Sequence, residues 1–551
     1  MSFIGICGGD PHGSAPASFS RFILPFAYQL EEVCPSYHSV GHFEPFVIPD
    51  KSWRRNYFTH ETGRALFEGA QWFELKQPEK KSLYFTPKFI DSKICRIELS
   101  QPQLVLFEWK DPPLGKSRPS DTSPDLLQTG FLILEAYFAD KKARLEDLLL
   151  LNEYLRYWQK PYDIHENEPS KFGFSYAEFM KGFPFCQDEP YYDRWECLLK
   201  MPVKKGGTLY RLIPDIWLTT AQGRVSAKTP TVEKSSDGGD DWLVHADTRT
   251  YVWTCAILKG GGNALREYFS MSGAPACRFG HWIKLLNVDK PKGNASATHN
   301  STNFEKAWAD KHTYKRWEED GTFYGFNYHC GAMLGPPEKN PPLCRHFGGI
   351  YFDQTLMLLY LRVTLFRFSM ALNRISAEAR DKNSDECEKV REKWREDFRQ
   401  LRWSFSLFTN LYQFPMLSNQ QQGLEMYALA RRSMDVDELF REVQQEINSS
   451  EEYLASWQTE RLSKQMMRLT VVATVGAVFA LAHSFPSVIK DANELIVSEP
   501  SGPILGVYAL SVVVFTALIL LAIYYSKELS EFIQAIASKK PDGGRLDNNE
   551  K

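Results

Sequence analysis

Two stretches near the C-terminal end of the chain differ from the rest because they contain no charged side chain. Residues 469–486 have no Lys, Arg, Asp or Glu over 18 positions, and residues 503–525 have none over 23. A helix of 18 residues is about 27 Å long, close to the roughly 30 Å of a hydrocarbon core, and 23 residues span it with some tilt. These lengths favour two transmembrane helices over two buried helices of a soluble core.

The charges that flank these stretches predict their orientation. The 16-residue connection 487–502 carries one cation, Lys490, against Asp491, Glu494 and Glu499. Cations before the first stretch and in the tail 526–551 are Arg461, Lys464, Arg468, Lys527, Lys539, Lys540 and Arg545. By the positive-inside rule both termini are cytoplasmic and the short acidic loop is external. The pattern fits a bacterial inner membrane and equally a eukaryotic plasma or organelle membrane.

A long amphipathic helix is predicted immediately before the first span. Residues 435–475 contain neither Pro nor Gly. Apolar residues recur there mostly at three- and four-residue steps, at Leu439, Phe440, Val443, Ile447, Leu454, Trp457, Leu462 and Met466. Such a stripe, too long for the core of one protomer, is typical of a stalk that packs in an oligomer and continues into the membrane.

The first 345 residues mix the patterns of strands and helices. Residues 97–100, 104–109 and 250–258 are rich in β-branched or aromatic residues and are predicted strands. Residues 145–158 and 265–269 have helical spacing, whereas polar loops are expected at 228–241 and 291–301. The predicted fold class is therefore an α+β cytoplasmic domain, 1–345.

Helical patterns dominate from residue 346 to the first span, so 346–468 is predicted to be a helical region that ends in the stalk. Residues 351–374 are apolar, but Asp353, Arg362 and Arg367 interrupt them. Charges are costly inside a bilayer, so we expect a buried or oligomer-facing helix here and not a third span. Further helices are expected over 384–411 and 419–432.

Composition narrows the classes of function. The 551 residues exceed one compact core, and a net charge of −3 gives no basis for a nucleic-acid partner. Ten cysteines are scattered without a C-x-x-C pair, which fits reduced thiols in a cytoplasmic domain, and the N-terminus predicts no signal peptide. No nucleophile elbow, zinc-protease motif or phosphate-binding loop occurs, so we expect neither an enzyme nor a covalent cofactor.

One cluster of residues offers ligand types that suit zinc. His329, Cys330, Cys344 and His346 lie within 18 residues. Their spacing matches no standard zinc finger, and prolines lie between them. Two interpretations are open, a metal site and a set of residues without a shared role.

The junction between stalk and first span carries a resemblance to a known family. Residues 463–475 read Ser-Lys-Gln-Met-Met-Arg-Leu-Thr-Val-Val-Ala-Thr-Val. With the two spans and the acidic loop, this run resembles the CorA-type divalent-cation transporter superfamily over about the last 100 residues. The resemblance implies a homo-oligomer in the lipid bilayer, in that family a pentamer, which passes Mg²⁺ or another divalent cation through a pore lined by the first span.

The resemblance also assigns the pore face and shows one departure. Carried over position by position, the face is Ser463, Met466, Leu469, Ala473, Ala477, Ala480, Ser484 and Ser487. Asp491, Glu494 and Glu499, repeated around a ring, would concentrate cations at the mouth. The family's Gly-Met-Asn signature is absent, and its positions fall near Ser487, Val488 and Ile489. A stripe of small residues that packs helices closely is the competing interpretation of the face.

Three classes of function remain. The first is a CorA-like channel or transporter gated by its cytoplasmic domain. The second is a membrane effector with an unselective pore, opened when the domain binds a small-molecule regulator such as a nucleotide messenger. The third is a membrane-anchored scaffold or enzyme, for which the hairpin is only an anchor.

Overall fold

The computed structural model describes most of the N-terminal three-quarters of the chain and the long helix that follows. The described residues are 5–12, 15, 17–28, 43–75, 83–89, 93–107, 128–156, 218–220, 223–225, 249–259, 277–291, 302–337, 341–380, 387–412 and 416–494. The predicted second span 503–525, the tail 526–551, the loop 228–241, the helix 265–269 and almost all of the loop 291–301 lie outside them. The chain divides into two compact units, Met1–Ile447 and Asn448–Lys551.

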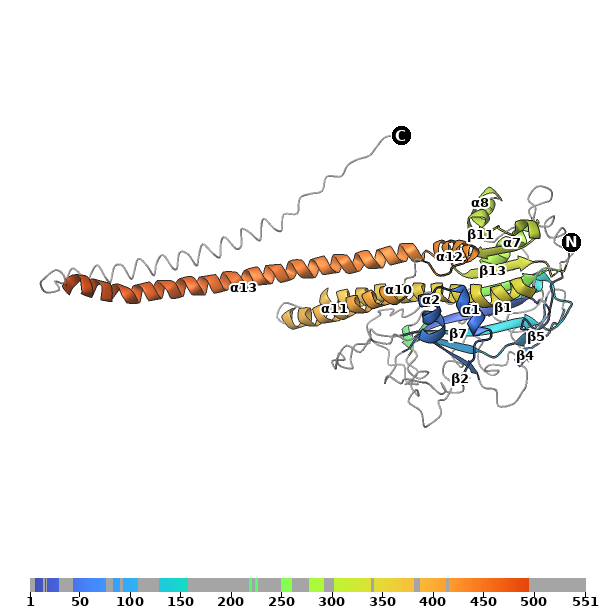
Figure 1. Ribbon diagram of the computed structural model, residues 1–551, viewed down its shortest axis with the longest axis horizontal. Coiled ribbons are helices and arrows are strands. Elements are labelled where there is room, and N and C mark those ends of the chain that lie inside the picture. The colour runs from blue at the N-terminus through green and yellow to red at the C-terminus, as the bar shows by residue number, and fades with distance from the viewer. Residues whose placement is uncertain are drawn as a thin grey trace, which may run out of the picture. The chain divides into compact units, whose positions relative to one another are not determined.

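Strands alternate with short helices in the described chain as far as β13, and from α9 onward the described chain is helical (Figure 1). The strands are β1 Phe19–Tyr28, β2 Phe43–Pro45, β3 Ala70–Leu75, β4 Leu83–Phe85, β5 Ile97–Leu99, β6 Gln103–Phe107, β7 Gln128–Phe138, β8 Leu218–Thr220, β9 Gly223–Val225, β10 Tyr251–Ile257, β11 Thr313–Tyr314, β12 Phe323–Phe326 and β13 Cys330–Gly335. The helices are α1 Lys51–Tyr57, α2 His60–Arg64, α3 Leu145–Leu155, α7 Cys277–Asn287, α8 Thr302–His312, α9 Pro341–His346, α10 Phe352–Arg380, α11 Cys387–Tyr412, α12 Gln421–Ser433 and α13 Val436–Glu494. Short turns of other helix types are η1 Ala65–Gly69, η3 Glu318–Asp320 and η4 Phe347–Tyr351.

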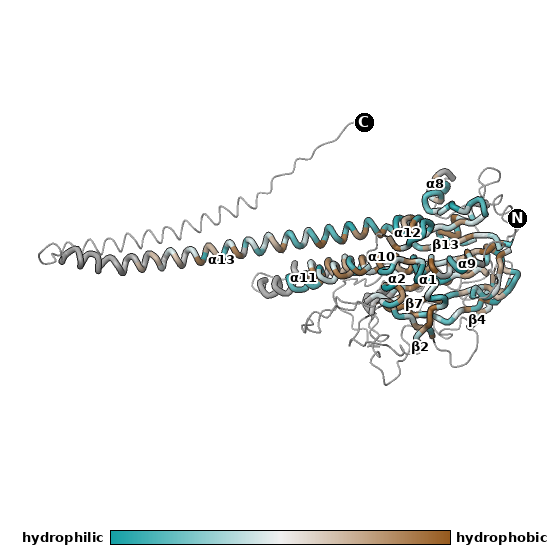
Figure 2. The backbone as a smooth tube through the Cα atoms, viewed as in Figure 1, coloured by the Kyte–Doolittle hydropathy of each residue, from teal (hydrophilic) through white to brown (hydrophobic). Residues whose placement is uncertain are grey.

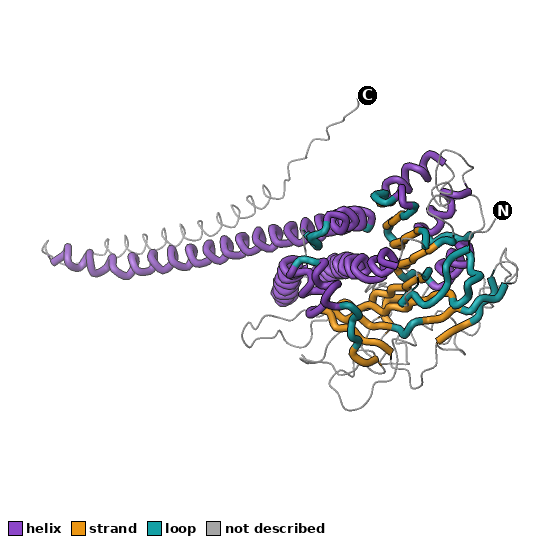
Figure 3. Tube along the Cα trace, turned by 45° about the vertical axis from the view of Figure 1, so that its right-hand side comes forward, coloured by secondary structure: helices purple, strands orange, loops and turns teal. Residues whose placement is uncertain are grey.

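Eleven of the described strands form one mixed sheet, whose strands are orange in Figure 3. Its main path is β11-β12-β13-β10-β1-β7-β6-β3-β2, and β5 joins β4 to β7. The pairs are antiparallel except β10–β13, which is parallel. The centre is β1, which pairs with β7 from Phe19 to Tyr28 and with β10 only as far as Ile23. Pro25 lies beyond the β10 pairing, where its missing N–H leaves no gap in that ladder.

The two faces of the sheet are covered by different helices. Side chains alternate between faces along each strand, so neighbouring residues enter different layers. On one face Phe22, Leu134 and Val252 pack in a single apolar cluster with α3 and α7. On the other face the ring of Phe107 stacks on Tyr360 of α10, with centroids 4.1 Å apart. The α+β class predicted for this region is therefore confirmed.

Helix α10 is buried, which agrees with the prediction made from Asp353, Arg362 and Arg367. Arg54 of α1 forms an ion pair with Asp353, and Arg367 donates to Thr129 Oγ1 at 2.6 Å. Among the residues whose side chains the structure describes, the stretch Pro342–Asn373 is the one helical run that is long and apolar enough to cross a membrane; much of the predicted span 469–486 lies outside those residues. Of the most apolar 18 residues in this stretch, 72% are buried inside the protein.

Helices α11, α12 and α13 fall close to their predicted ranges, and α10–α12 form what we call the helical support. Phe368 of α10 packs against Phe405 and Phe408 of α11, with centroids 5.3 and 5.5 Å apart. The predicted strands over 97–100, 104–109 and 250–258 correspond to β5, β6 and β10.

Helix α13 differs from prediction at its far end. The first span was expected to end at Pro486, followed by a loop, whereas the helix continues to Glu494. Pro486 removes one backbone hydrogen bond from this helix. Residues 487–494 contain neither Gly nor Pro, so nothing after Pro486 disfavours the helical backbone. The first half of the predicted acidic loop is therefore helical.

Candidate functional site

The predicted pore face lies on one unbroken helix. Ser463, Met466, Leu469, Ala473, Ala477 and Ala480 are all exposed along α13. Ser484 and Ser487 follow on the same helix, although the structure does not describe their side chains. Figure 2 shows apolar residues recurring among polar ones along the described part of α13. The structure thus gives the face the helical geometry that its three- and four-residue spacing requires.

The large apolar side chains of this part of α13 are solvent-exposed in the single chain. Met466 is 69% exposed and Leu469 73%, and Leu462 and Met467 are exposed as well. A run of exposed apolar side chains on one helix marks a surface that contacts another molecule or lipid. Asp491 and Glu494 lie in the last turns of the same helix, whereas Glu499 lies outside the described residues.

The first turns of α13, residues 436–447, form the stalk root and are packed against the helical support. Val436, Val443 and Ile447 are buried there. The ring of Phe440 stacks on Phe405 of α11 with centroids 5.8 Å apart, and Ser369 of α10 hydrogen-bonds Glu446. The support and the root are therefore one packed body, in which a shift of α10 or α11 would repack the start of the stalk.

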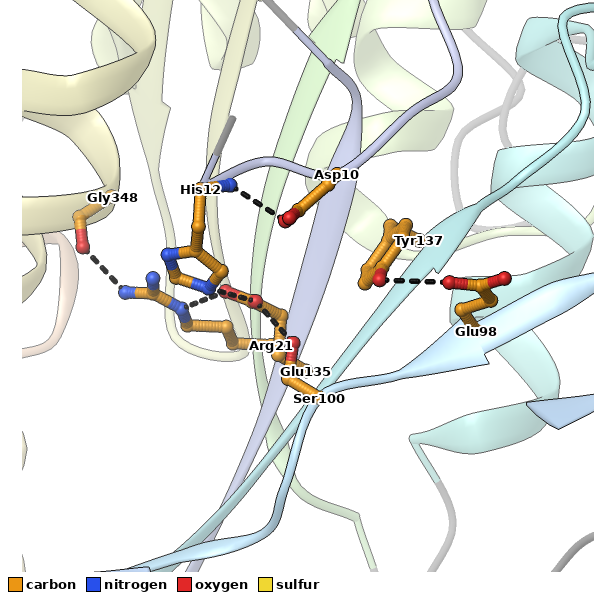
Figure 4. A network of polar contacts seen from close by, with 8 residues as sticks. All are labelled: Asp10, His12, Arg21, Glu98, Ser100, Glu135, Tyr137 and Gly348. Carbon is orange, nitrogen blue, oxygen red and sulfur yellow. Dashed lines mark hydrogen bonds and ion pairs between the residues drawn. The ribbon is translucent and has the colours of Figure 1, made fainter. Parts of the chain in front are cut away.

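A buried carboxylate at the centre of the sheet organises a network of polar contacts (Figure 4). Glu135 of β7 accepts from Arg21 Nε of β1 at 2.7 Å and from Ser100 Oγ at 2.7 Å. The ring of His12, from the N-terminal segment, lies 2.7 Å from the same carboxylate. Arg21 also donates through Nη1 to the carbonyl of Gly348 in η4, at 2.6 Å. The network links the N-terminal segment, the sheet and the turn that leads into α10.

The charges of this network fix its protonation. Burial opposes ionisation of Glu135, but Arg21 and His12 outweigh it and hold the pKa of that carboxyl well below its usual range. The hydrogen bond to Glu135 in turn raises the pKa of His12. An ionised carboxylate with donors on both oxygens is a structural anion and is poorly suited to accept a proton from a substrate.

Sequence reasoning did not anticipate this network, because its members are far apart in the chain. His12 lies in the Gly-rich run 8–13, which lacks the Lys and Ser/Thr of a phosphate-binding loop and gave no signal of a site. The sequence signal that could have indicated the network is a charged residue within an apolar run, and Arg21 and Glu135 each interrupt such a run. Two opposite charges of this kind predict a buried pair, but only the register of β1 on β7, in which they are partners, identifies it.

The predicted zinc ligands are placed with separate partners. Cys330 Sγ contacts the carbonyl of Leu285 at 3.5 Å, and Cys344 Sγ lies 4.0 Å from Cys255 Sγ. The His346 ring stacks on Trp53, and that of His329 packs edge-on against Tyr328. Throughout the described ranges, no three His, Cys, Asp or Glu residues are grouped to hold a metal ion. Burial also raises the pKa of Cys330, which disfavours the thiolate that zinc requires.

No protein-family model matches the chain, and neither a curated protein nor a solved structure matches it. The residues and contacts described above therefore carry the functional proposal.

Proposed function

We propose that the chain is one subunit of a homo-oligomeric membrane channel or transporter that passes cations. Its pore is lined by the face of α13 that begins at Ser463, and its N-terminal domain gates that pore. The observation that carries the proposal is the unbroken helix α13, which joins a packed root to an uncharged stretch of spanning length. The resemblance of residues 463–475 to the CorA-type pore entry supports the same arrangement.

The exposed apolar residues of α13 support assembly into a ring. Leu462 and Met467, which the pore face does not include, would lose their exposure to water if copies of the helix packed side by side, and burial of one such side chain is worth about 1.5–3 kcal/mol. On the pore axis Met466 and Leu469 would form an apolar constriction, which can gate by dewetting. Beyond them, the small side chains of Ala473, Ala477 and Ala480 leave room for water.

Gating by the N-terminal domain is supported by the contacts at the stalk root. Phe440 and Glu446 contact two different helices of the support, α11 and α10. A ligand that favours one packing of these helices would bias the position of α13, since tightly packed interfaces have discrete arrangements.

An unselective pore opened by a small-molecule regulator is the second candidate. The specific observation in its favour is the absent Gly-Met-Asn signature, because Val488 and Ile489 offer no side-chain oxygen to a hydrated divalent cation. Flux measurements on liposomes that contain the purified full chain separate the two functions. Mg²⁺, Zn²⁺ or Ni²⁺ flux that exceeds Na⁺ and K⁺ flux supports the divalent transporter, and equal flux of all ions supports the unselective pore.

The pore face is tested by cysteine substitution and a charged, thiol-specific methanethiosulfonate reagent. We expect the reagent to block flux through Ala473→Cys and Ala477→Cys, because both side chains would meet the water-filled path. Val475→Cys is the matched control, since it lies midway between them in sequence and about 200° around the helix from each. The parent chain, whose ten cysteines all lie before residue 388, gives the background rate.

Two results would refute the proposal. One is a monomer in mild detergent, because the pore requires a closed ring. The other is equal block through the Ala477 and Val475 variants, which would show that the predicted face does not line the path. No flux from an intact oligomer would leave α13 as an anchor, the third class.

A further inference from the structure

The middle of α10 contains a buried guanidinium group that lacks a carboxylate partner. Arg362 is 1% exposed, and its Nη1 donates to the carbonyl of Tyr328 at 2.9 Å. Its Nε and Nη2 are buried and meet no acceptor among the described residues. The other two charged residues of this stretch are partnered, Asp353 by Arg54 and Arg367 by Thr129. Leaving a charged donor unsatisfied in this way costs at least about 1–3 kcal/mol.

A second buried donor without an acceptor among the described residues belongs to Tyr251, on the strand next to this turn. The hydroxyl of Tyr251 is buried and has no hydrogen-bond partner in the described structure. Tyr251 opens β10, whose next residue, Val252, donates its backbone N–H to His329 O at 2.9 Å. That carbonyl directly follows the Tyr328 carbonyl that holds Arg362. Strand pairing therefore places Tyr251 near the turn that holds Arg362, and the two side chains are close enough for each to affect the pKa of the other.

The described surroundings of Arg362 are aromatic, and no described carboxylate pairs with it. Its guanidinium lies over the ring of Tyr328, 3.2 Å from the centroid, and also near Phe366. Burial lowers the pKa of Arg362, and Tyr328, Tyr251 and Asp435 act in the opposite direction. Asp435, the residue before α13, is exposed, and no ion pair of the described residues joins it to Arg362. The positive charge thus lies against aromatic rings, with no carboxylate paired to it among the described residues.

We propose that Nε and Nη2 of Arg362 and the hydroxyl of Tyr251 bind a small monovalent anion, chloride in physiological solution. A water molecule could accept hydrogen bonds from these groups but would leave the buried charge uncompensated, whereas a halide satisfies the donors and neutralises the charge. Sulfate or phosphate fits poorly, because these groups supply few donors for its oxygens and a multivalent ion costs more to desolvate. The site lies where α10, β10 and the turn before β13 meet, so its occupancy stabilises the helical support.

The test is thermal unfolding of the full chain in detergent while chloride replaces gluconate at constant ionic strength. Gluconate is too large for an enclosed site. At chloride concentrations above the dissociation constant, we expect the Tm to rise by about 1–2 °C for each tenfold increase in chloride. This is the shift that mass action gives for a folding unit of this length. Bromide should act as chloride does.

Three variants decide the assignment. Arg362→Met should abolish the chloride-dependent shift, and Tyr251→Phe, which removes one hydroxyl from a buried ring, should reduce it. Tyr427→Phe is the matched control, because that hydroxyl already has a donor in Arg431 and should leave the shift intact. If Arg362→Met does not fold, Tyr251→Phe still decides. Two results would overturn the proposal and assign only water to these groups. One is a Tm that rises as much when gluconate is added as when chloride is added. The other is a chloride-dependent shift that is unchanged in Tyr251→Phe and Arg362→Met.

Discussion

Replacing Asp353 by Asn should destabilise the N-terminal unit more than a typical point substitution does. Asp353 lies in the first turn of α10, and its carboxylate pairs with Arg54, which is itself buried. Arg54 Nε donates to Asp353 Oδ2 at 2.7 Å, and Nη2 donates to Oδ1. The amide preserves the shape of the side chain but removes its charge and one acceptor, so a buried guanidinium remains without its counter-ion.

The expected magnitude follows from burial and from the size of the unit. Removing one partner of a buried ion pair costs about 3–5 kcal/mol. Unfolding entropy near the melting temperature is about 2.1 cal/mol/K per residue, or about 0.9 kcal/mol/K for a unit of this length. The Tm should therefore fall by about 3–5 °C, because the shift is the lost free energy divided by that entropy.

The assay is thermal unfolding of the purified full chain in detergent, followed by tryptophan fluorescence. Glu396→Gln is the matched control, because it breaks an exposed pair with Arg399 that contributes at most about 1 kcal/mol. The double variant Arg54→Met with Asp353→Asn should be more stable than Asp353→Asn alone, since it leaves no unpaired buried charge. An Asp353→Asn shift no larger than the Glu396→Gln shift would refute the reasoning.

Two further predictions concern the sheet and its polar network. In Gly331→Ala the new Cβ would lie 2.3 Å from the Trp253 ring. We expect this overpacking to cost about 1–3 kcal/mol and to lower the Tm by about 1–3 °C. Gly280→Ala is the control and should not lower the Tm, because its Cβ would meet nothing within 4 Å. The bond to Glu135 raises the pKa of His12 above 6.5, so the stability it contributes is complete below pH 6.5 and is lost as pH rises through the higher folded value. The Tm difference between the parent and His12→Gln should therefore shrink above pH 6.5, and a difference that is constant with pH would contradict the pairing.

The helical half of the described fold could be predicted from sequence because its signals are local. Residues 351–374 combine apolar side chains with Asp353 and Arg367, a pattern that is costly in lipid but stable in a core that supplies partners. The absence of Pro and Gly over 435–475 likewise identified α13, because nothing in that range interrupts the i to i−4 ladder.

The order of the strands and the polar sites could not be predicted, because they depend on pairings between distant segments. Ser20 of β1 is the register partner of Thr254 in β10 and of Ala136 in β7, and no local pattern encodes either match. Arg362 was visible as a charge in an apolar run, but its missing partner is evident only once Tyr328 and Tyr251 are placed around it.

The position of the parallel pair β10–β13 has a consequence for the order of events during synthesis. The sheet cannot be completed until β13 has been made, since β13 joins β10 to the edge strands β12 and β11. About 130 further residues separate Gly335 from Leu469, and at 5–20 residues per second they take about 7–27 s to translate. Sheets dominated by long-range pairing fold in milliseconds to seconds. The N-terminal sheet therefore has time to close before residue 469 leaves the ribosome. If residues 469–486 span a membrane as proposed, their insertion would begin on a chain whose sheet is already formed.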